Sequence, residues 1–128
     1  MDAVSEYEAG GAHDSAGRAD QAIPHYERAL EKGLPIDLEF RCRLQLASSL
    51  RNVGRVADAI GIFDDAISRA PDDAALRLFR AFALADAGRE REALVDVIDL
   101  ARTRIDSPEI ARYARSLENY NRDLADDA

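Results

Sequence analysis

One short block of sequence occurs three times in this chain and constrains its fold more than any other feature. Each copy begins with a Gly-Arg pair, and an alanine followed by isoleucine or leucine comes five and six residues after the glycine. The glycines are Gly17, Gly54 and Gly88, which lie 37 and then 34 residues apart. Self-similarity at such a period is the sequence signature of stacked helical hairpins.

The residues around each glycine repeat as well. A large apolar residue follows at the same offset, as Tyr26, Phe63 and Val97, and a small residue precedes it by seven positions, as Gly10, Ala47 and Ala81. Apolar residues three and four apart on both sides predict two antiparallel helices joined by a tight turn. The glycine supplies the left-handed backbone of the turn, and small residues let the paired helices approach closely. The alanines expected at these contacts are Ala47, Ala59, Ala81 and Ala93.

Chain breaks separate the hairpins. Gly33-Leu34-Pro35 follows the first and Ala70-Pro71-Asp72-Asp73 the second, with Asp72 or Asp73 as a helix cap, and Ser107-Pro108-Glu109 starts a last helix. The expected helices are 3–16, 19–32, 38–53, 56–70, 73–87, 90–104 and 108–124. We therefore predict an all-α fold, a right-handed α-solenoid of three hairpins plus a C-terminal capping helix, in a single domain over residues 1–128. The repeats are expected at about 3–36, 40–73 and 74–107, with the capping helix at 108–124.

The capping helix carries one apolar stripe, which is expected to cover the exposed face of the last hairpin. The stripe consists of Ile110, Tyr113, Ala114, Leu117, Tyr120 and Leu124. The first helix is the least favourable of the set, because Gly10 and Gly11 each cost roughly 1 kcal/mol inside a helix.

Charge and composition narrow the classes of function. The formal net charge of −8 argues against binding nucleic acid or an anionic membrane surface. Cys42 is the only cysteine, which excludes an internal disulfide and fits a reducing compartment. The sequence that follows Met1 lacks the pattern of a secretory signal, and no apolar run approaches the ~20 residues of a membrane span. A cytoplasmic location is expected.

The Gly, Ala, Tyr/Phe, Ala and Pro spacing resembles the tetratricopeptide repeat over nearly the whole chain. Three segments, 45–55, 81–90 and 113–117, more narrowly resemble the small bacterial group-5 tetratricopeptide-repeat proteins. That resemblance implies the fold more than a particular activity. The chain departs from the general repeat at Arg80, where leucine is usual, at Leu100, where alanine is usual, and through three extra residues near 33–36.

In stacked hairpins the first helix of each pair lines a concave groove, where a ligand is expected. The candidate ligand-binding residues lie on the outward faces of the first helix of the second hairpin and the first helix of the third. They are Arg41, Gln45, Ser48, Arg51, Asn52, Phe79, Phe82 and Asp86. Residues on the opposite face are expected to pack inside, namely Cys42, Leu46, Leu50 and Val53. The arginines suit a partner's carboxylate and the phenylalanines an apolar side chain.

Two alternatives stay open for these candidate residues. The arginines of the groove could instead form pairs within the protein, with Asp58, Asp86 or Glu39, and the phenylalanines could fill the core. The lysine and asparagine clamp with which some chaperone-docking repeats grip a terminal carboxylate is not matched here.

Catalysis and metal binding are not expected. His13, His25 and Cys42 show no metal-ligand spacing, and adjacent acids such as Asp64-Asp65 point about 100° apart on a helix. No glycine-rich phosphate loop, nucleophile elbow or dinucleotide fingerprint is present, so neither a catalytic residue nor a cofactor is predicted.

Three hypotheses about function follow. The first is an adaptor or scaffold whose groove binds an unidentified protein or peptide. The second is a homodimerising structural module that pairs through Tyr113 and Tyr120 on the last helix. The third, from resemblance to repeat-type secretion chaperones in size and repeat number, is a chaperone that holds a client segment.

Overall fold

The computed structural model describes residues 1–127, and these form helices joined by short turns, with no strand among them. The helices are α1 (Ala3–Ser15), α2 (Ala19–Lys32), α3 (Ile36–Asn52), α4 (Val56–Arg69), α5 (Ala74–Asp86), α6 (Glu90–Arg104), α7 (Pro108–Arg112) and α8 (Ala114–Asp126). The first six agree with the predicted ranges to within two residues at each end. The predicted all-helical fold of repeated hairpins is confirmed.

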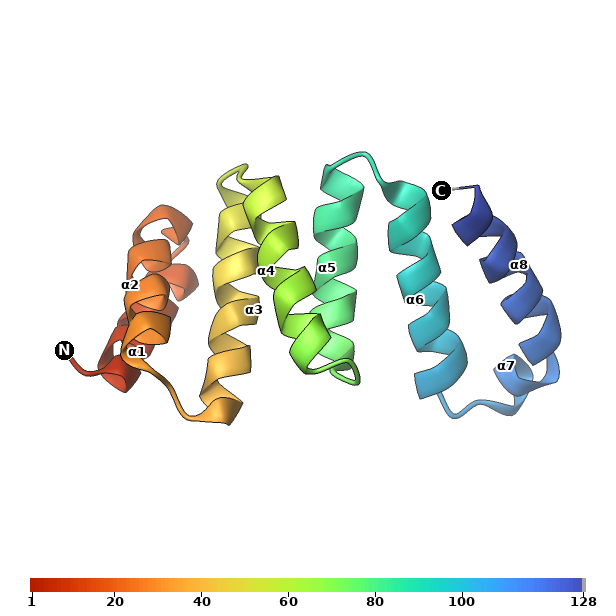
Figure 1. The fold of residues 1–128 in the computed structure, drawn as a ribbon, viewed down its shortest axis with the longest axis horizontal. Helices are drawn as coiled ribbons and strands as arrows, with labels where there is room; N and C mark the ends of the chain where they lie inside the picture. The colour runs from red at the N-terminus through yellow and green to blue at the C-terminus, as the bar shows by residue number, and fades with distance from the viewer. Residues whose placement is uncertain (128) are drawn as a thin grey trace. The chain divides into compact units, whose positions relative to one another are not determined.

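The helices form two compact units, Met1–Pro71 and Asp72–Ala128. In the first unit α1 packs against α2, α2 against α3, and α3 against α4, so that two antiparallel hairpins lie side by side (Figure 1). In the second unit α5 and α6 form a hairpin, and α6 also packs against α8. The second unit thus contains one hairpin and the C-terminal helices.

The glycine at each hairpin turn has the left-handed backbone that the sequence predicts. The φ angles are 77°, 88° and 78° at Gly17, Gly54 and Gly88. At the second turn the Gly54 N–H donates to the Arg51 carbonyl at 3.0 Å, and the Arg55 N–H donates to the Leu50 carbonyl at 2.8 Å. The same two hydrogen bonds recur at the other two turns. They satisfy carbonyls at the end of the first helix with a conformation that only glycine adopts without strain.

The arginine after each glycine also has a structural role. Arg55 Nε contacts Asp58 Oδ2 at 2.9 Å, and Arg89 Nη2 contacts Glu92 Oε2 at 2.7 Å, three residues into the following helix. At the first turn the residue three positions after the arginine is Gln21 rather than an acid, and Arg18 Nε donates instead to His13 Nδ1 at 3.0 Å. The repeated Gly-Arg pair therefore has a structural role, because the arginine side chain stabilises the turn between the two helices.

Side-chain caps mark two of the predicted helix starts. Of the two candidate aspartates before α5, Asp73 is the cap, and its Oδ1 accepts from the Leu76 N–H at 3.1 Å. Ser107 caps α7 through a hydrogen bond from the Ile110 N–H to its Oγ at 3.3 Å, and Pro108 stands in the first turn. Both caps satisfy backbone donors that a helix end would leave unpaired.

The small residue seven positions before each turn glycine sits in the helix contact. Gly10, Ala47 and Ala81 are all buried. A Cβ atom added to Gly10 would lie 2.5 Å from the ring of Tyr26, closer than Cβ atoms come to other atoms in folded proteins. Gly10, which disfavours the helix locally, is thus required by the packing of α1 on α2.

The predicted capping helix is wrong as a single element. The chain leaves helical geometry at Tyr113, where φ is −106° and ψ is 19°, and two helices, α7 and α8, replace one. The Tyr113 N–H donates to the Ile110 carbonyl at 3.0 Å, which is a tightened last turn rather than a continued helix. Tyr113 and Tyr120 are 58% and 69% exposed, so these two members of the stripe stay mostly in solvent rather than covering the last hairpin.

One residue of the predicted packed face of α3 is also misplaced. Cys42, Leu46 and Leu50 are buried as expected, but Val53 is 41% exposed. Val53 follows the last residue of α3 as its C-cap, and the helical periodicity that would turn its side chain inward has ended there.

Candidate functional site

The predicted ligand-binding residues lie on two helices that belong to different compact units. Five of them are on α3 of the first unit, namely Arg41, Gln45, Ser48, Arg51 and Asn52. Three are on α5 of the second unit, namely Phe79, Phe82 and Asp86. Within each helix the spacing of three and four residues keeps them on one face. Each set therefore forms its own candidate surface.

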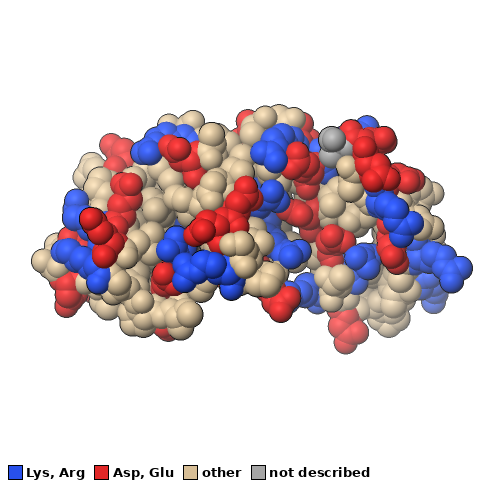
Figure 2. All heavy atoms as spheres, viewed as in Figure 1, with Lys and Arg blue, Asp and Glu red and all other residues tan. Residues whose placement is uncertain are grey.

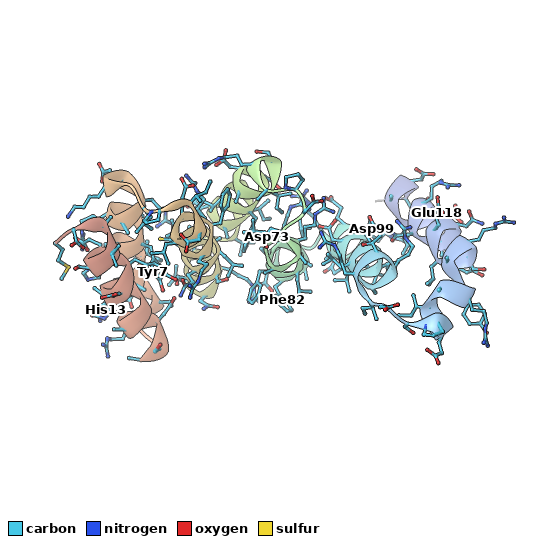
Figure 3. The ribbon with its side chains drawn as sticks, turned by 90° about the horizontal axis from the view of Figure 1, so that it is seen from below. Tyr7, His13, Asp73, Phe82, Asp99 and Glu118 are labelled. Atoms are coloured by element: carbon cyan, nitrogen blue, oxygen red, sulfur yellow. The ribbon has the colours of Figure 1, made fainter. Side chains whose placement is uncertain are left out.

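Gln45 faces α1 on the first of these surfaces. Its Oε1 accepts a short hydrogen bond from the hydroxyl of Tyr7, which comes from α1 (Figure 3). The Tyr7 ring also lies against Tyr26, with ring centroids 6.1 Å apart. Burial raises the pKa of Tyr7, and the charge of Arg41 opposes that shift. Tyr7 is therefore a neutral hydroxyl at neutral pH, and it joins α1 to the predicted binding face of α3.

The two adjacent serines of α3 have different environments. Ser49 is buried, and its hydroxyl donates to Asp14 Oδ1 at 2.9 Å, while Asp14 Oδ2 accepts from Tyr26 at 2.6 Å. Burial, followed by the hydrogen bond to Asp14, raises the pKa of Tyr26 well above its usual range. Ser48 is half-buried, and its Oγ has no hydrogen-bond partner among the described residues. Asp14 thus joins three helices through Ser49 and Tyr26, whereas the Ser48 hydroxyl is buried without a hydrogen-bond partner among the described residues.

The acids expected as alternative partners of the groove arginines mostly form ion pairs with other residues. Glu39 contacts Arg43 at 3.4 Å and Arg69 at 3.1 Å. Burial alone would raise the pKa of Glu39, but its bonds to these two arginines lower it below the usual range. Asp58 is held by Arg55 at 2.9 Å. Two of the three alternative pairings for the groove arginines are therefore taken up elsewhere.

The two predicted arginines differ in their surroundings. Arg41 is exposed and makes no ion pair or hydrogen bond within residues 1–127. Arg51 is half-buried and does interact within the protein. Asn52 is exposed at the end of α3. Arg41 is therefore the better candidate to receive an anionic group.

The surface of α5 is apolar in character. The rings of Phe79 and Phe82 pack edge to face, with centroids 5.7 Å apart, and remain 38% and 46% exposed. Leu78 is 40% exposed on the same helix, and Asp86 is exposed at its last position. The phenylalanines thus do not fill the core, and α5 presents large apolar side chains to solvent.

An apolar pocket adjoins this surface within the second unit. Its volume is about 330 Å³, and it is lined by Ala74, Ala75 and Leu78 of α5 and by Val97, Leu100 and Ala101 of α6. Arg104 and Ile105 complete the lining. Arg104 Nη2 donates to the backbone carbonyl of Asp72, which fixes its guanidinium. The pocket can accept an apolar group and offers almost nothing to hydrogen-bond it.

Arg80, which stands where the repeat usually has leucine, forms an ion pair inside the third hairpin. Arg80 Nη1 lies 2.8 Å from Asp96 Oδ2, and both side chains are about one-fifth exposed. This ion pair joins α5 to α6 where the repeat usually has an apolar contact. The substitution therefore alters how the hairpin is held together without removing it.

Sequence reasoning missed a charge cluster in the first unit. Glu6 is buried on α1 and contacts His25 at 2.7 Å, Arg28 at 3.1 Å and Lys32 at 3.4 Å, all from α2. The hydrogen bond to His25 is the main cause that lowers the pKa of Glu6 to about 2, with Arg28 and Lys32 adding to it against the effect of burial. The cationic residues share one face of α2, which their spacing shows, but the sequence did not indicate which acid would meet them.

Nothing in residues 1–127 suggests a metal site, since no group of three histidine, cysteine or acidic side chains is gathered there. Cys42 is fully buried beside the Tyr26 carbonyl, and burial raises the pKa of its thiol to about 12. The thiol thus stays protonated and unreactive. On the face seen in Figure 2, basic and acidic side chains are interspersed. Among the described helices none is both long and apolar enough to cross a membrane.

Antiparallel hairpins that repeat with glycine turns and small residues at each helix contact define a helical-repeat protein. The chain belongs to the tetratricopeptide-repeat family, because the group-5 family model described as "Tetratrico peptide repeat" matches residues 3–124. No curated protein and no solved structure matches it. Tetratricopeptide repeats are in general modules of protein–protein interaction rather than catalysts, which gives this chain its broad functional class.

Proposed function

We propose that this chain is an adaptor module with two binding faces, one on α3 of the first unit and one on α5 of the second, each of which binds an extended or helical segment of a partner protein. The observation that carries the proposal is the exposed aromatic pair of α5, Phe79 and Phe82, beside an apolar pocket. Large apolar side chains grouped on a surface mark interaction sites, and aromatic residues dominate the binding energy of protein interfaces.

The face of α3 would contribute polar recognition. Arg41 is exposed and unpaired within residues 1–127. Gln45 stands about one turn further along the helix and is already oriented by Tyr7. A guanidinium and an amide group in one row suit a carboxylate and the backbone of a partner segment. We therefore expect a segment bound at the face of α3 to carry an acidic group, and a segment bound at the face of α5 to carry apolar side chains.

Peptide selection tests this proposal, since a random library needs no identified partner. A 16-residue display library is selected on the immobilised protein, and the affinities of the enriched peptides are measured by fluorescence anisotropy. Arg41→Glu is expected to weaken the peptides that bind the face of α3, and Phe82→Ala those that bind the face of α5, each at least about tenfold, which corresponds to about 1.4 kcal/mol. Circular dichroism confirms beforehand that both variants keep their helices.

Matched controls come from exposed residues outside the two faces. Arg115→Glu reverses a charge on α8, and Leu94→Ala truncates an apolar residue of α6 that is 47% exposed, close to the 46% of Phe82. Both controls should bind the selected peptides as the wild type does. If the controls lose as much affinity as the two test variants, or no peptide is enriched, the adaptor proposal fails.

A second candidate function is self-association through the last helices. It is favoured by Tyr113 and Tyr120, which are 58% and 69% exposed and so leave most of each ring free for a contact with another subunit. A symmetric contact would bring these rings together in a pair of subunits. Sedimentation velocity over a range of concentrations tests this. A mass that rises with concentration in the wild type, but not in Tyr113→Ala/Tyr120→Ala, would support it, and a constant monomer mass would exclude it.

A further inference from the structure

Residues 108–126 favour a single helix by their sequence, yet the chain is broken at Tyr113. The apolar stripe runs through this residue with helical spacing, and neither glycine nor proline occurs after Pro108. Tyr113 itself has φ −106° and ψ 19°, in the bridge region next to helical geometry, and no side chain caps the start of α8. Since no local signal ends α7, the break follows from the way α8 packs on the rest of the second unit.

The helix that α8 packs against is α6, and few side chains are buried in this part of the unit (Figure 1). Asn121 is the buried residue of α8, Ala93 is the buried residue of α6, and α7 has none. In the first unit, by comparison, α2 buries four side chains where it packs against α1 and α3. The docking of α8 therefore gains less from apolar burial than the helix contacts of the first unit do.

The polar groups at this contact are only partly satisfied. Asn121 Nδ2 donates to the Val95 carbonyl at 3.2 Å and to Asp99 Oδ1 at 3.1 Å, but the Asn121 Oδ1 is buried without a partner among the described residues. Arg102 Nη2 donates to the same Asp99 oxygen at 2.9 Å, while its Nε is buried and unpaired within residues 1–127. Burying a polar atom without a hydrogen bond opposes docking. The bonds of Asn121 thus orient α8 on α6 without holding it tightly.

The two helices nevertheless present matching groups to each other. Asp99 and Arg102 of α6 and Glu118 and Arg122 of α8 line one surface pocket of about 230 Å³, together with Asn121 (Figure 3). Each helix therefore brings an acid and an arginine to the contact. Because every copy of the chain carries both faces, α8 of a second copy fits α6 as well as the chain's own α8 does.

We propose that α8 is exchanged between two copies of this chain: it leaves its own α6, joins α7 in one continuous helix and docks on α6 of the second copy. Such an exchange keeps every bond of the α6–α8 contact, so a dimer can form without a new interface. Residues 105–113, which have to rearrange, include no buried side chain. Closing the break at Tyr113 extends the helix, which adds backbone hydrogen bonds. The exchange goes beyond the adaptor function and does not depend on it.

Two substitutions of Tyr113 test the exchange, because both remove the ring and only one favours a continuous helix. Alanine favours the helix and glycine disfavours it, and a dimer closes two breaks. We expect the dimerisation constant of Tyr113→Ala, measured by sedimentation velocity over a range of concentrations, to exceed that of Tyr113→Gly at least about tenfold. Equal constants, or a constant monomer mass in Tyr113→Ala, would overturn the proposal. If tyrosine rings made the contact instead, both variants would lose the dimer alike.

The matched control places the same two residues at Arg115. This position lies inside α8 and is helical whether or not α8 is exchanged. Arg115→Ala and Arg115→Gly should therefore have dimerisation constants that agree within about threefold, although glycine weakens the helix itself. Circular dichroism confirms beforehand that all four variants are folded. A difference at Arg115 as large as that at Tyr113 would contradict a role for the break.

A mixing experiment tests which copy supplies the docked helix. Asn121→Asp sets a carboxylate against Asp99 of its own α6, and Asp99→Asn removes the opposing charge. In an exchanged pair of these two variants, the altered α8 lies on the altered α6 and the two unaltered helices lie together, so no repulsion remains. We expect native mass spectrometry of ¹⁵N-labelled Asn121→Asp mixed with Asp99→Asn to show heterodimer at least about fivefold above random pairing. Random pairing, or no heterodimer, would show that α8 is not exchanged.

Discussion

The first and third hairpins of this chain are built on one pattern but are packed to different degrees. In the first, a tyrosine ring fits against a glycine, and its hydroxyl is held by Asp14, which also binds Ser49 of the next hairpin. In the third, the corresponding Val97 leaves a pocket that is open to solvent. The comparison shows that a repeat keeps its hairpin without a central aromatic residue, and that the residue in its place, Val97, is then partly exposed beside an apolar pocket.

The largest effect should come from truncating the two corresponding residues. Tyr26→Ala removes a fully buried ring and leaves Asp14 without that partner, so we expect a loss of about 3–5 kcal/mol in the free energy of unfolding. Val97→Ala, at a partly exposed site beside an existing hollow, should cost about 1 kcal/mol or less. Urea denaturation followed by circular dichroism measures both. Equal losses would show that the two hairpins are packed alike.

Adjacent glycines of α1 should respond in opposite directions to the same change. Gly10→Ala places a Cβ atom 2.5 Å from the buried Tyr26 ring and should destabilise the protein by about 1–3 kcal/mol, even after its gain in helix propensity. Gly11→Ala meets no atom within 4 Å and should stabilise by about 0.5–1 kcal/mol. Thermal melts of the two variants provide the measurement. Stabilisation by both would mean that α1 and α2 are not in close contact at Gly10.

Filling the third hairpin should bring it closer to the first two. Val97→Phe is expected to stabilise the protein by about 1 kcal/mol, which is the usual range for filling a cavity. The same change at Leu94, which is 47% exposed, should have almost no effect. Denaturation midpoints of the two variants would show the difference. A destabilised but folded Val97→Phe would indicate that the pocket cannot accept a ring in this orientation.

The smallest and most gradual effect concerns the charge cluster that the first hairpin has around Glu6. Because His25, Arg28 and Lys32 lower the pKa of Glu6 in the folded state to about 2, its contribution is present above its usual value of 4.5 and is lost as the pH falls towards 2. Arg28 and Lys32 are partly exposed, so solvent screens them. Glu6→Gln should therefore be less stable than wild type at pH 6, and the difference should shrink on acidification. A difference independent of pH would exclude a role for the carboxylate charge.

Much of the fold could be predicted because its determinants are local. The turn glycines and the caps Asp73 and Ser107 act within a few residues of their positions, and the small residues at the helix contacts recur at a fixed offset from each turn glycine. The break at Tyr113 could not be predicted, since the apolar stripe continues through it with helical spacing and neither glycine nor proline marks the end of α7. The residue Arg80 was visibly unusual, but its partner Asp96 lies across the hairpin.

The candidate site was predictable in outline and not in detail. Helical spacing placed Arg41 and Phe82 on exposed faces. Whether an arginine is already paired depends on residues from other helices, which is why the sequence alone could not distinguish Arg41 from Arg51. The sequence presented Val97 as one more large apolar residue. Its failure to fill the space left between α5 and α6 depends on volume and cover, which appear only when the helices are packed.

The measurement that tests the central claim most directly is a double-mutant cycle between Phe82 and an apolar residue of a selected peptide. Affinities are measured for wild type and Phe82→Ala, each with the original peptide and with a peptide whose apolar residue is replaced by alanine. If the face of α5 receives that residue, either change alone weakens binding at least about tenfold, and the second adds almost nothing to the first. Strictly additive losses would show that the residue binds elsewhere and that the exposed phenylalanines of α5 are not the binding face.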